Sequence, residues 1–453
     1  MNPNDRIFLS KLNKRWMMGL AQQGLGLGTI ALWLAMPLAA VAQSNLITVP
    51  GPVKPGVNEA DAFPVNPLEI KEPDPLLPNP DRPLSTLERQ RLQGALEAMN
   101  LQAAVLLQAE KPVEAFALWN RELRLRRSLG LLEETTALGR VGAIAWQQSQ
   151  TQQLRYINQR LAQIQAQMQG IAVVSAVGTV PAPEKAYTER DRETILDALG
   201  LAYELVRKPD LALTVYQPKL REARQKRDRV AEFNALNSIG VLHLDWFKYP
   251  QAQTSYQELL AVAQQNQDLF NQAVYLIQLA YIHEQSKQPA QAAAYLEQLL
   301  ALYQDQPEVL PAIQLRLAEN YDAANQFEAA ERNYQQTYTL TQTLVQSSYS
   351  ADALQKLGAL YRRYDRLAAA QQVFDFLVDY EQSVFNYYGA MRAADQLGQV
   401  RLQQQDLPGA IAAFERGLAF AQELKLRPDY FQKRIQTAQT GKANPTPSHS
   451  STP

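Results

Sequence analysis

The sequence has no cysteine among its 453 residues and only three histidines. The absence of cysteine excludes disulfide bonds, thiolate nucleophiles, thiolate-bound metals and attachment of a lipid through an N-terminal cysteine. The fold must therefore be held together by side-chain packing. An excess of either charge is also lacking, since 44 lysines and arginines face 45 aspartates and glutamates. A net charge of −1 provides no general attraction to nucleic acid, so no nucleic-acid partner is predicted.

Catalytic motifs are missing as well. No glycine-rich phosphate loop follows a strand-like segment, and neither GxSxG nor HExxH occurs. Acidic pairs such as Glu133 and Glu134 are expected on solvated faces, without an opposing group that would make them an acid and a base. The sequence predicts that the protein is not an enzyme and binds no metal or cofactor. A hydrolase without these motifs would require clustered carboxylates with perturbed pKa values in a groove.

The N-terminal region has the composition of an export signal. Four basic residues among the first fifteen precede an apolar run over Gly24–Val41, and Ala40-Val41-Ala42 fits a cleavage site. Residues 1–42 are predicted to be a signal peptide, so the mature chain would begin near Gln43 in the periplasm or, in a cyanobacterial host, in the thylakoid lumen. The alternative is an uncleaved membrane anchor, because the apolar run of 18 residues is at the lower limit for spanning a bilayer.

A proline-rich segment follows the export signal. Ten prolines between Gln43 and Pro83 leave few backbone donors for helix or sheet, so residues 43–84 are predicted to be a disordered, extended linker. A ligand for a groove that binds polyproline helices is the alternative. The linker ends at Ser85-Thr86-Leu87-Glu88, where Ser85 and Glu88 have the spacing of a capping box that starts a helix.

From Ser85 almost to the C-terminus, apolar residues recur at intervals of three and four, which predicts helix throughout. In this region a small residue stands twelve positions before an alanine in one unit after another. The pairs are Ala103/Ala115, Gly200/Ala212, Gly240/Ala252, Ala280/Ala292, Ala318/Ala330, Gly358/Ala370 and Gly398/Ala410, with Gly142 as a degenerate member. Successive small residues lie 39, 58, 40, 40, 38, 40 and 40 positions apart, which indicates internal structural repeats.

Each unit is predicted to be an antiparallel helical hairpin. A large side chain four positions after the alanine fills the flank of a crossing at which the small residue lets two helices approach. Proline suits the first turn of a second helix, and five units place one there: Pro112, Pro209, Pro250, Pro289 and Pro408. Gly358, Tyr361, Ala370 and Phe374 are thus predicted to form one packing seam. Arg362 and Arg363, which the seam does not fix, are predicted to be free for recognition.

The pattern L-G-x2-Y-x8-A-x3-F, as in the segment that begins at Leu357, resembles the tetratricopeptide repeat (TPR) in a variety with a period near 40 residues. The resemblance covers roughly residues 85–440 and implies an all-α fold, a right-handed α-solenoid of about eight hairpins. An insertion at about 170–186 interrupts the period, and a capping helix is expected at about 427–440. The tail at 441–453, rich in proline, serine and threonine, is predicted to be disordered.

The resemblance also implies a binding surface, since the first helices of TPR hairpins line a concave groove. The matching positions here are Thr194, Asp197, Glu204, Asn234, Asn237, Asp245, Tyr281, Glu284, Glu319, Asp322, Asp352, Gln355, Arg362, Arg363 and Arg392. Such a groove suits an extended peptide, because amides satisfy its backbone, carboxylates bind its basic side chains and arginines bind an acidic group. A hydrated inner surface without a ligand is the alternative.

Three further features have competing interpretations. His243 and His283 share one repeat slot and are expected to pack beside the seam rather than bind a metal. The basic runs Lys219–Arg229 and Arg121–Arg127 are predicted to be solvated convex faces, with docking to an anionic surface as the alternative. The insertion near residues 170–186 is either a tolerated loop or a docking element.

The sequence predicts a non-enzymatic TPR scaffold that binds a protein or an extended peptide in an extracytoplasmic compartment. The alternative is an assembly scaffold that its uncleaved N-terminal segment tethers to a membrane, with the proline-rich linker setting its reach. A membrane is a partner only in that second case. The identity of the partner and the oligomeric state do not follow from the sequence, because one fold serves binders of unrelated targets.

Overall fold

The computed structural model describes residues 66–70, 73–77, 82–170, 173–175, 178–180, 187–344 and 347–440. The chain divides into two units, residues 1–63 and 64–453, and all described residues belong to the second. The predicted signal peptide, the alternative membrane anchor and the predicted C-terminal tail lie outside the described residues. None of the described helices is both long enough and apolar enough to cross a bilayer.

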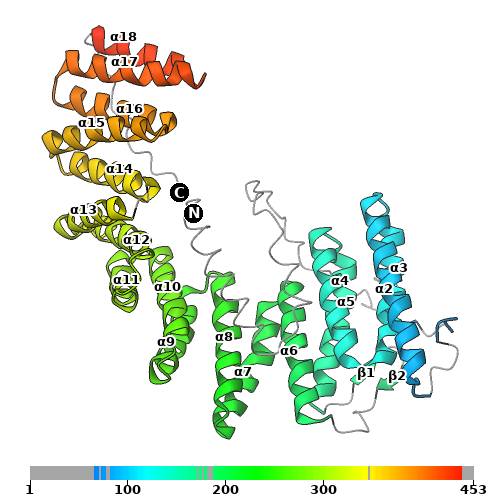
Figure 1. Ribbon diagram of the computed structural model, residues 1–453. Coiled ribbons are helices and arrows are strands. Elements are labelled where there is room, and N and C mark those ends of the chain that lie inside the picture. Colours follow the sequence, from blue (N-terminus) through cyan, green and yellow to red (C-terminus); the bar gives the residue numbers. More distant parts are fainter. Residues whose placement is uncertain are drawn as a thin grey trace, which may run out of the picture. The chain divides into compact units, whose positions relative to one another are not determined.

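The described helices form eight hairpins and one further helix (Figure 1). The hairpins are α2 (Thr86–Gln108) with α3 (Pro112–Arg126), α4 (Leu131–Gln147) with α5 (Thr151–Met168), α6 (Glu189–Leu205) with α7 (Pro209–Lys226), α8 (Arg229–Asp245) with α9 (Tyr249–Gln265), α10 (Leu269–Gln285) with α11 (Pro289–Leu302), α12 (Leu310–Ala323) with α13 (Phe327–Thr343), α14 (Ser347–Arg363) with α15 (Leu367–Ser383), and α16 (Tyr387–Gln403) with α17 (Leu407–Glu423). The predicted all-α array of about eight hairpins is confirmed, whereas its right-handed sense stays a prediction. We call the first helix of each hairpin its A helix and the second its B helix.

Local sequence explains where the helices begin. The Ser85 hydroxyl accepts a hydrogen bond from the Glu88 amide at 3.3 Å, and the Glu88 carboxylate accepts one from the Ser85 amide at 2.9 Å, which completes the predicted capping box. Thr188 caps α6 in a similar way, by accepting from the Asp191 amide at 3.1 Å. The five predicted prolines lie in the first turns of the B helices α3, α7, α9, α11 and α17.

The turns between helices use left-handed backbone at residues other than glycine. In the middle of the array such a residue recurs every 20 positions with φ between 55° and 60°, at Arg207, Arg227, Phe247, Gln267 and Lys287. The residue after it then bonds a carbonyl in the last turn of the helix, as the Lys248 amide does with the His243 oxygen at 2.8 Å. The short turns keep each A helix beside its B helix.

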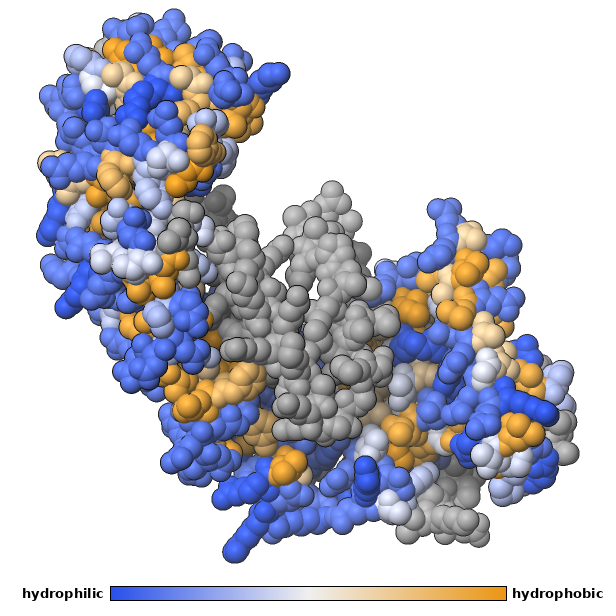
Figure 2. Space-filling model, viewed as in Figure 1, coloured by the Kyte–Doolittle hydropathy of each residue, from blue (hydrophilic) through white to orange (hydrophobic). Residues whose placement is uncertain are grey.

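The seams are built as the repeat pattern predicts. Gly358 on α14 lies so close to Phe374 on α15 that a Cβ there would stand 2.7 Å from the ring. Ala370 and Phe374 are fully buried, and Tyr361 is 7% exposed. The same close approach joins Gly200 to Tyr216 and Gly398 to Phe414. Hydrophilic residues cover most of the described surface in the view of Figure 2, with smaller hydrophobic groups between them.

Part of the proline-rich linker packs against the first hairpins. We call residues 66–70 and 73–77 the strap. Leu68 in the strap is 1% exposed and belongs to the same core as Trp119 on α3 and Ile157 on α5. The strap therefore differs from the extended, unpacked linker that the composition predicts for residues 43–84. The physical reason is that a single leucine, which hardly alters the composition, inserts into the apolar core of the first two hairpins.

A pair of short strands, a C-terminal helix and one 3₁₀ turn complete the fold. β1 (Val173–Ser175) and β2 (Gly178–Val180) pair in antiparallel fashion inside the predicted insertion, with Val173 opposite Val180. The choice between a tolerated loop and a docking element stays open for this insertion. At the other end α18 (Pro428–Gln439) lies where the capping helix is expected, and it buries Phe431 and Ala438 against the last hairpin. A 3₁₀ turn, η2 (Arg127–Leu129), follows α3.

Candidate functional site

The predicted groove residues lie on six A helices. α6 carries Thr194, Asp197 and Glu204; α8 carries Asn234, Asn237 and Asp245; α10 carries Tyr281 and Glu284; α12 carries Glu319 and Asp322; α14 carries Asp352, Gln355, Arg362 and Arg363; and α16 carries Arg392. All of these residues are exposed or half-buried, so none of them belongs to the buried seams between helices. They differ in what their side chains contact, and this difference divides the A-helix surface into two stretches.

From α10 onward, neighbouring A helices bind each other through polar side chains. The Glu284 carboxylate on α10 accepts two hydrogen bonds of 2.8 Å from the Arg316 guanidinium on α12. The Asn320 amide donates a third one to it, at 2.7 Å. Paired charged hydrogen bonds of this kind are about twice as strong as neutral ones. The chain itself therefore satisfies the Glu284 carboxylate.

The same kind of contact joins α12 to α14. The Lys356 ammonium lies 2.6 Å from the Glu319 carboxylate, and the Arg363 guanidinium forms an ion pair with Asp322. The Asp322 side chain is only 20% exposed, so its charge is partly screened from a ligand by its partner. Both predicted acidic residues of α12 are thus neutralised by cations of the next A helix.

Arg362 continues the series from α14 to α16. Its guanidinium donates hydrogen bonds to the side-chain oxygens of Gln396 at 2.7 Å and Gln399 at 3.0 Å. The prediction that Arg362 and Arg363 are free to carry recognition is wrong, because the neighbouring A helices supply acceptors for both guanidinium groups. We call the series of contacts from α10 to α18 the polar ladder; its last step is a 2.9 Å bond from the Tyr430 hydroxyl on α18 to Asp395 on α16.

Sequence reasoning missed the partners Arg316, Lys356 and Gln396. Each stands two positions before the small residue of its own repeat, a slot that the groove offsets did not include. A polar residue that recurs in this slot is the signal that would have identified the ladder. On a helix, that slot and the predicted groove positions are close enough for long side chains of adjacent A helices to meet.

The A helix α8 differs from the ladder. Asn234 is exposed and Asn237 is half-buried, and among the described residues neither side-chain amide has a hydrogen-bond partner. Asp245, at the end of the same helix, is exposed and has Arg207 as its nearby opposite charge. This surface has donors and acceptors that its neighbours leave available.

Two carboxylates in this stretch have perturbed pKa values. Burial raises the pKa of Glu204 to about 7; the Tyr216 hydroxyl, which donates a 2.7 Å hydrogen bond, opposes this shift, and the Asp245 charge adds to it. Surrounding protein likewise raises the pKa of Asp245 although the residue is exposed, and Arg207 opposes that shift. At neutral pH this part of the surface can therefore hold a proton that an ordinary carboxyl would lose.

The remaining predicted residues lie at the margins of this stretch. Asp197 pairs with Lys219 of the B helix α7, and Arg392 on α16 is exposed. Tyr281 on α10 is half-buried, and burial, followed by the neighbouring Tyr249 and Glu284, raises the pKa of its hydroxyl. The neighbouring A helices leave five predicted residues around α8 without a hydrogen bond in the described part of the chain: Glu204, Asn234, Asn237, Asp245 and Tyr281.

Both histidines of the shared slot are packed. His283 is 4% exposed, lies 2.7 Å from the Gln288 side-chain oxygen through Nδ1 and stacks on Tyr295 with ring centres 5.4 Å apart. Burial and the nearby Lys248 lower the pKa of His243. No group of three or more metal-binding side chains exists among the residues that the structure describes.

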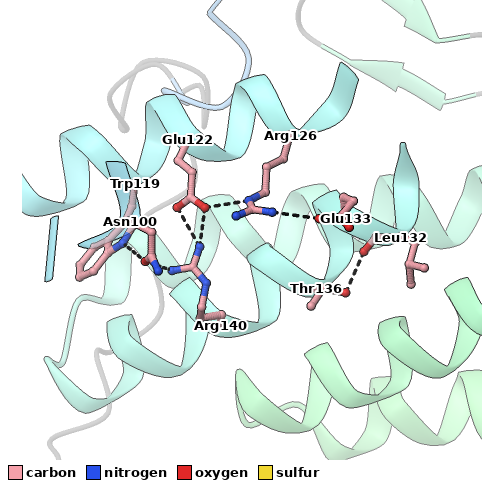
Figure 3. Close-up of polar contacts among 8 residues, drawn as sticks. All are labelled: Asn100, Trp119, Glu122, Arg126, Leu132, Glu133, Thr136 and Arg140. Carbon is pink, nitrogen blue, oxygen red and sulfur yellow. Dashed lines mark hydrogen bonds and ion pairs between the residues drawn. The ribbon is translucent and has the colours of Figure 1, made fainter. Parts of the chain in front are cut away.

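The first two hairpins contain a buried network of charges. Glu122 on α3 is fully buried, and its carboxylate accepts hydrogen bonds from Arg126 at 2.7 Å and from Arg140 on α4 at 2.7 and 2.8 Å. Figure 3 shows the carboxylate between the two guanidinium groups, with the Asn100 amide oxygen accepting from Arg140 and, at 2.9 Å, from the Trp119 ring. The network joins α2, α3 and α4.

A second buried carboxylate extends this network. Glu134 is 1% exposed and accepts from Arg127 at 2.9 Å and from Arg160 at 2.6 and 2.8 Å. The predictions of a solvated face for Glu134 and of a solvated basic face at Arg121–Arg127 are wrong, because Arg121, Arg126 and Arg127 pair with acids of the strap, α3 and α4. Glu133 keeps a side chain that is 41% exposed. Mutual neutralisation makes the network structural rather than reactive.

The other basic run agrees with the prediction of a solvated face. Lys226 lies 3.0 Å from Glu222 and also pairs with Glu189, and Arg224 lies 3.0 Å from Glu232. The side chains of Lys226, Glu222, Glu189 and Arg224 are well exposed, whereas Glu232 is 16% exposed. Exposed pairs of this kind contribute little stability. Interleaved acids thus offset the cations of Lys219–Arg229.

No protein-family model matches the sequence, and no curated protein matches it. Among solved structures, the chain is similar to BtubC from P. vanneervenii, at 20% identity over 54% of this chain and 96% of that one, with a TM-score of 0.35. The apo form of RapI is 12% identical over 67% and 81%, with a TM-score of 0.42. A signal-transduction ATPase from Pyrococcus horikoshii with a tetratricopeptide repeat sensor is 12% identical over 80% and 54%, with a TM-score of 0.35.

Proposed function

We propose that the chain is an exported, non-enzymatic scaffold that binds an extended segment of a protein partner along the A helices α6, α8 and α10. The observation that carries this proposal is the contrast within the A-helix surface. Between α10 and α18 the polar ladder satisfies most of the predicted groove side chains, whereas Asn234 and Asn237 on α8 have no partner among the described residues.

The chemistry of this stretch fits an extended peptide. An asparagine amide donates and accepts, so it matches the alternating N–H and C=O groups of a peptide backbone. Asp245 lies on the same helix and supplies a carboxylate for a basic side chain. Glu204 holds a proton near neutral pH, which lets it donate a hydrogen bond to a peptide carbonyl instead of repelling an acidic side chain.

The test is a cross-linked pull-down from the exported fraction with wild type and with Asn234→Ala/Asn237→Ala. The matched control is Gln264→Ala/Gln265→Ala, which removes two exposed amides from the B helix α9. We expect the α8 variant to lose a partner that the wild type and the α9 variant both retain. Equal recovery of every partner by all three chains would remove the groove assignment.

The compartment is part of the same proposal and rests on the sequence of residues 1–42. Cleavage near Gln43 would release the scaffold into the periplasm or the thylakoid lumen, whereas an intact Gly24–Val41 segment would tether it. Mass spectrometry of the mature N-terminus separates the two. A chain that begins near Gln43 excludes the tether, and a chain that begins at Met1 and fractionates with membranes excludes free export.

One observation favours hydrolysis as a second candidate function: the pKa values of Glu204 and Asp245 are both raised. Neighbouring carboxylates with separated pKa values are what acid–base chemistry requires. The main cause of the Glu204 shift is burial beside Tyr216, however, and its carboxylate is already held by that hydroxyl at 2.7 Å. Packing therefore accounts for the shift, and a hydrolase activity that Glu204→Gln abolishes would be needed to revive this candidate.

A further inference from the structure

The strap crosses a surface that the A-helix groove does not include. Its hydrogen bonds are with the B helices α3 and α5, and they come from both of its described parts, residues 66–70 and 73–77. Leu77 also packs against a cluster that includes residues of the A helix α2. The strap therefore occupies a position on the first two repeats that is separate from the α8 surface.

One apolar residue anchors the strap. Leu68 is 1% exposed and lies in the core formed by the first hairpins, together with Leu123 on α3 and Ile157 and Leu161 on α5. Full burial of a leucine is a large part of what a short peptide gains on docking to an apolar site. Leu77 is half-buried and supports this anchor by packing against a second cluster, which includes Leu92 and Leu96 on α2. Leu76 is 39% exposed and does not.

Charged and polar side chains fix the strap on both sides of this anchor. The Arg121 guanidinium donates to both oxygens of Asp74 at 2.7 and 2.9 Å, and this pairing lowers the pKa of that carboxyl. The Arg124 guanidinium donates to the Pro67 carbonyl at 2.8 Å. On the α5 side, the Gln163 amide donates to the Glu69 carboxylate at 3.1 Å.

Every hydrogen bond between the strap and α3 or α5 in the described part of the chain involves at least one side chain. The backbone hydrogen bonds of its described residues are local, from the Glu69 amide to the Asn66 oxygen at 2.9 Å and from the Leu77 amide to the Asp74 oxygen at 2.8 Å. No backbone-to-backbone hydrogen bond links these residues to α3 or α5 in the described part of the chain. Geometry of this kind, with one buried anchor and peripheral charged contacts, is that of a docked peptide rather than of a woven structural element.

We propose that the surface of α3 and α5 under the strap is a second peptide-binding site, which the chain's own strap occupies. The site fits an extended peptide with a leucine, a carboxylate directly after it and a second carboxylate five positions further on, the spacing of Leu68, Glu69 and Asp74. Arg121 would bind the second carboxylate, and the leucine would insert into the apolar core that Leu68 occupies. Arg124 would donate a hydrogen bond to the backbone carbonyl just before the leucine, as it does to Pro67. A partner with this pattern binds only when the strap leaves, so the strap is autoinhibitory.

The test uses the full chain and a fluorescent peptide with the sequence of residues 64–79. In wild type the tethered strap outcompetes the peptide, so little binding is expected. In Leu68→Asp the strap loses its anchor, and the peptide should bind at least about ten-fold more tightly than to wild type, because the fraction of competent sites rises. A peptide with the same Leu68→Asp change is the control and should bind neither chain.

A second variant protects the test against misfolding, since Leu68 belongs to the core. Glu69→Gln/Asp74→Asn weakens the polar contacts of the strap with α3 and α5 and leaves Leu68 unchanged. This variant chain should also bind the wild-type peptide more tightly than the wild-type chain does. Adding Arg121→Glu to either variant should abolish the gain. The proposal is overturned if the peptide binds neither strap variant, or if its affinity for the wild-type chain equals its affinity for the variants. Asn234→Ala/Asn237→Ala should leave peptide binding unchanged, so this result is independent of the α8 surface.

Discussion

A methyl group on Gly398 would lie 2.4 Å from the Phe414 ring, which is fully buried between α16 and α17. No carbon atom tolerates a neighbour at that distance, and close-packed interiors have little room to move one away. The missing side chain at position 398 is therefore what allows the two helices of the last hairpin to approach as closely as they do.

Replacing Gly398 by alanine should destabilise the protein. Overpacking of a core costs about 1–3 kcal/mol, and the gain of up to about 1 kcal/mol from the better helix propensity of alanine offsets only part of it. Urea unfolding followed by circular dichroism measures the difference. Gly94→Ala on α2 is the control, because nothing lies within 4 Å of a Cβ there, and it should stabilise instead. A stabilising Gly398→Ala would contradict the seam.

The seam between Gly398 and Phe414 is also the kind of feature that sequence reveals. The two residues are 16 positions apart in one hairpin with a short turn, so their contact follows from helix periodicity alone. The same slots recur in unit after unit, which fixed the number of hairpins and the place of each turn. Leu68 in the strap had no such support, because a single leucine among prolines has no period.

The residues with left-handed backbone in the turns lead to a second prediction about the free energy of unfolding. Gln405 has a φ of 64°, a backbone conformation that costs free energy in a residue with a Cβ atom. Its side chain is exposed, so packing against the core does not offset that cost. Gln405→Gly should raise the free energy of unfolding by about 1 kcal/mol, because glycine adopts this backbone without strain. Gln403→Gly, two positions earlier in the helix α16, should lower it by about the same amount. Thermal unfolding of both variants checks the opposite signs.

Two adjacent acids should respond very differently to neutralisation. Glu134→Gln leaves the buried Arg160 and the partly exposed Arg127 without their carboxylate, and breaking a buried pair such as that with Arg160 costs about 3–5 kcal/mol. Glu133→Gln removes only the exposed end of a pair with Arg126, which is expected to cost less than about 1 kcal/mol. Urea unfolding with hydrogen exchange of the α4 amides measures both. Similar losses in the two variants would contradict the buried network.

The pairing of Glu134 with Arg160 marks the limit of prediction from this sequence. The partners are 26 positions apart on different helices, and periodicity identifies which face a residue occupies but not which neighbour its side chain reaches. The same applies to Arg362, whose acceptors Gln396 and Gln399 come from the next hairpin. Periodicity therefore places the predicted groove positions on A helices, as the structure has them, but whether each side chain is paired or available required the structure.

The raised pKa of Glu204 makes stability depend on pH in a defined direction. The pKa is about 7 in the folded chain against an ordinary value of 4.5, so between these pH values the folded state binds more protons than the unfolded state. Stability should therefore fall as pH rises from 4.5 to 7, by at most about 3 kcal/mol. Urea unfolding at pH 5, 6, 7 and 8 measures this fall.

Glu204→Gln isolates this contribution, because glutamine stays neutral at every pH. The variant should match wild type near pH 4.5 and exceed it at pH 8, since only the wild type must then bury a charge beside Tyr216 and Asp245. Glu193→Gln, at an exposed position of the same helix, should keep the pH dependence of wild type. If Glu204→Gln instead keeps the wild-type slope, the proton is held elsewhere, and Glu204 then has no role as a hydrogen-bond donor to a bound peptide.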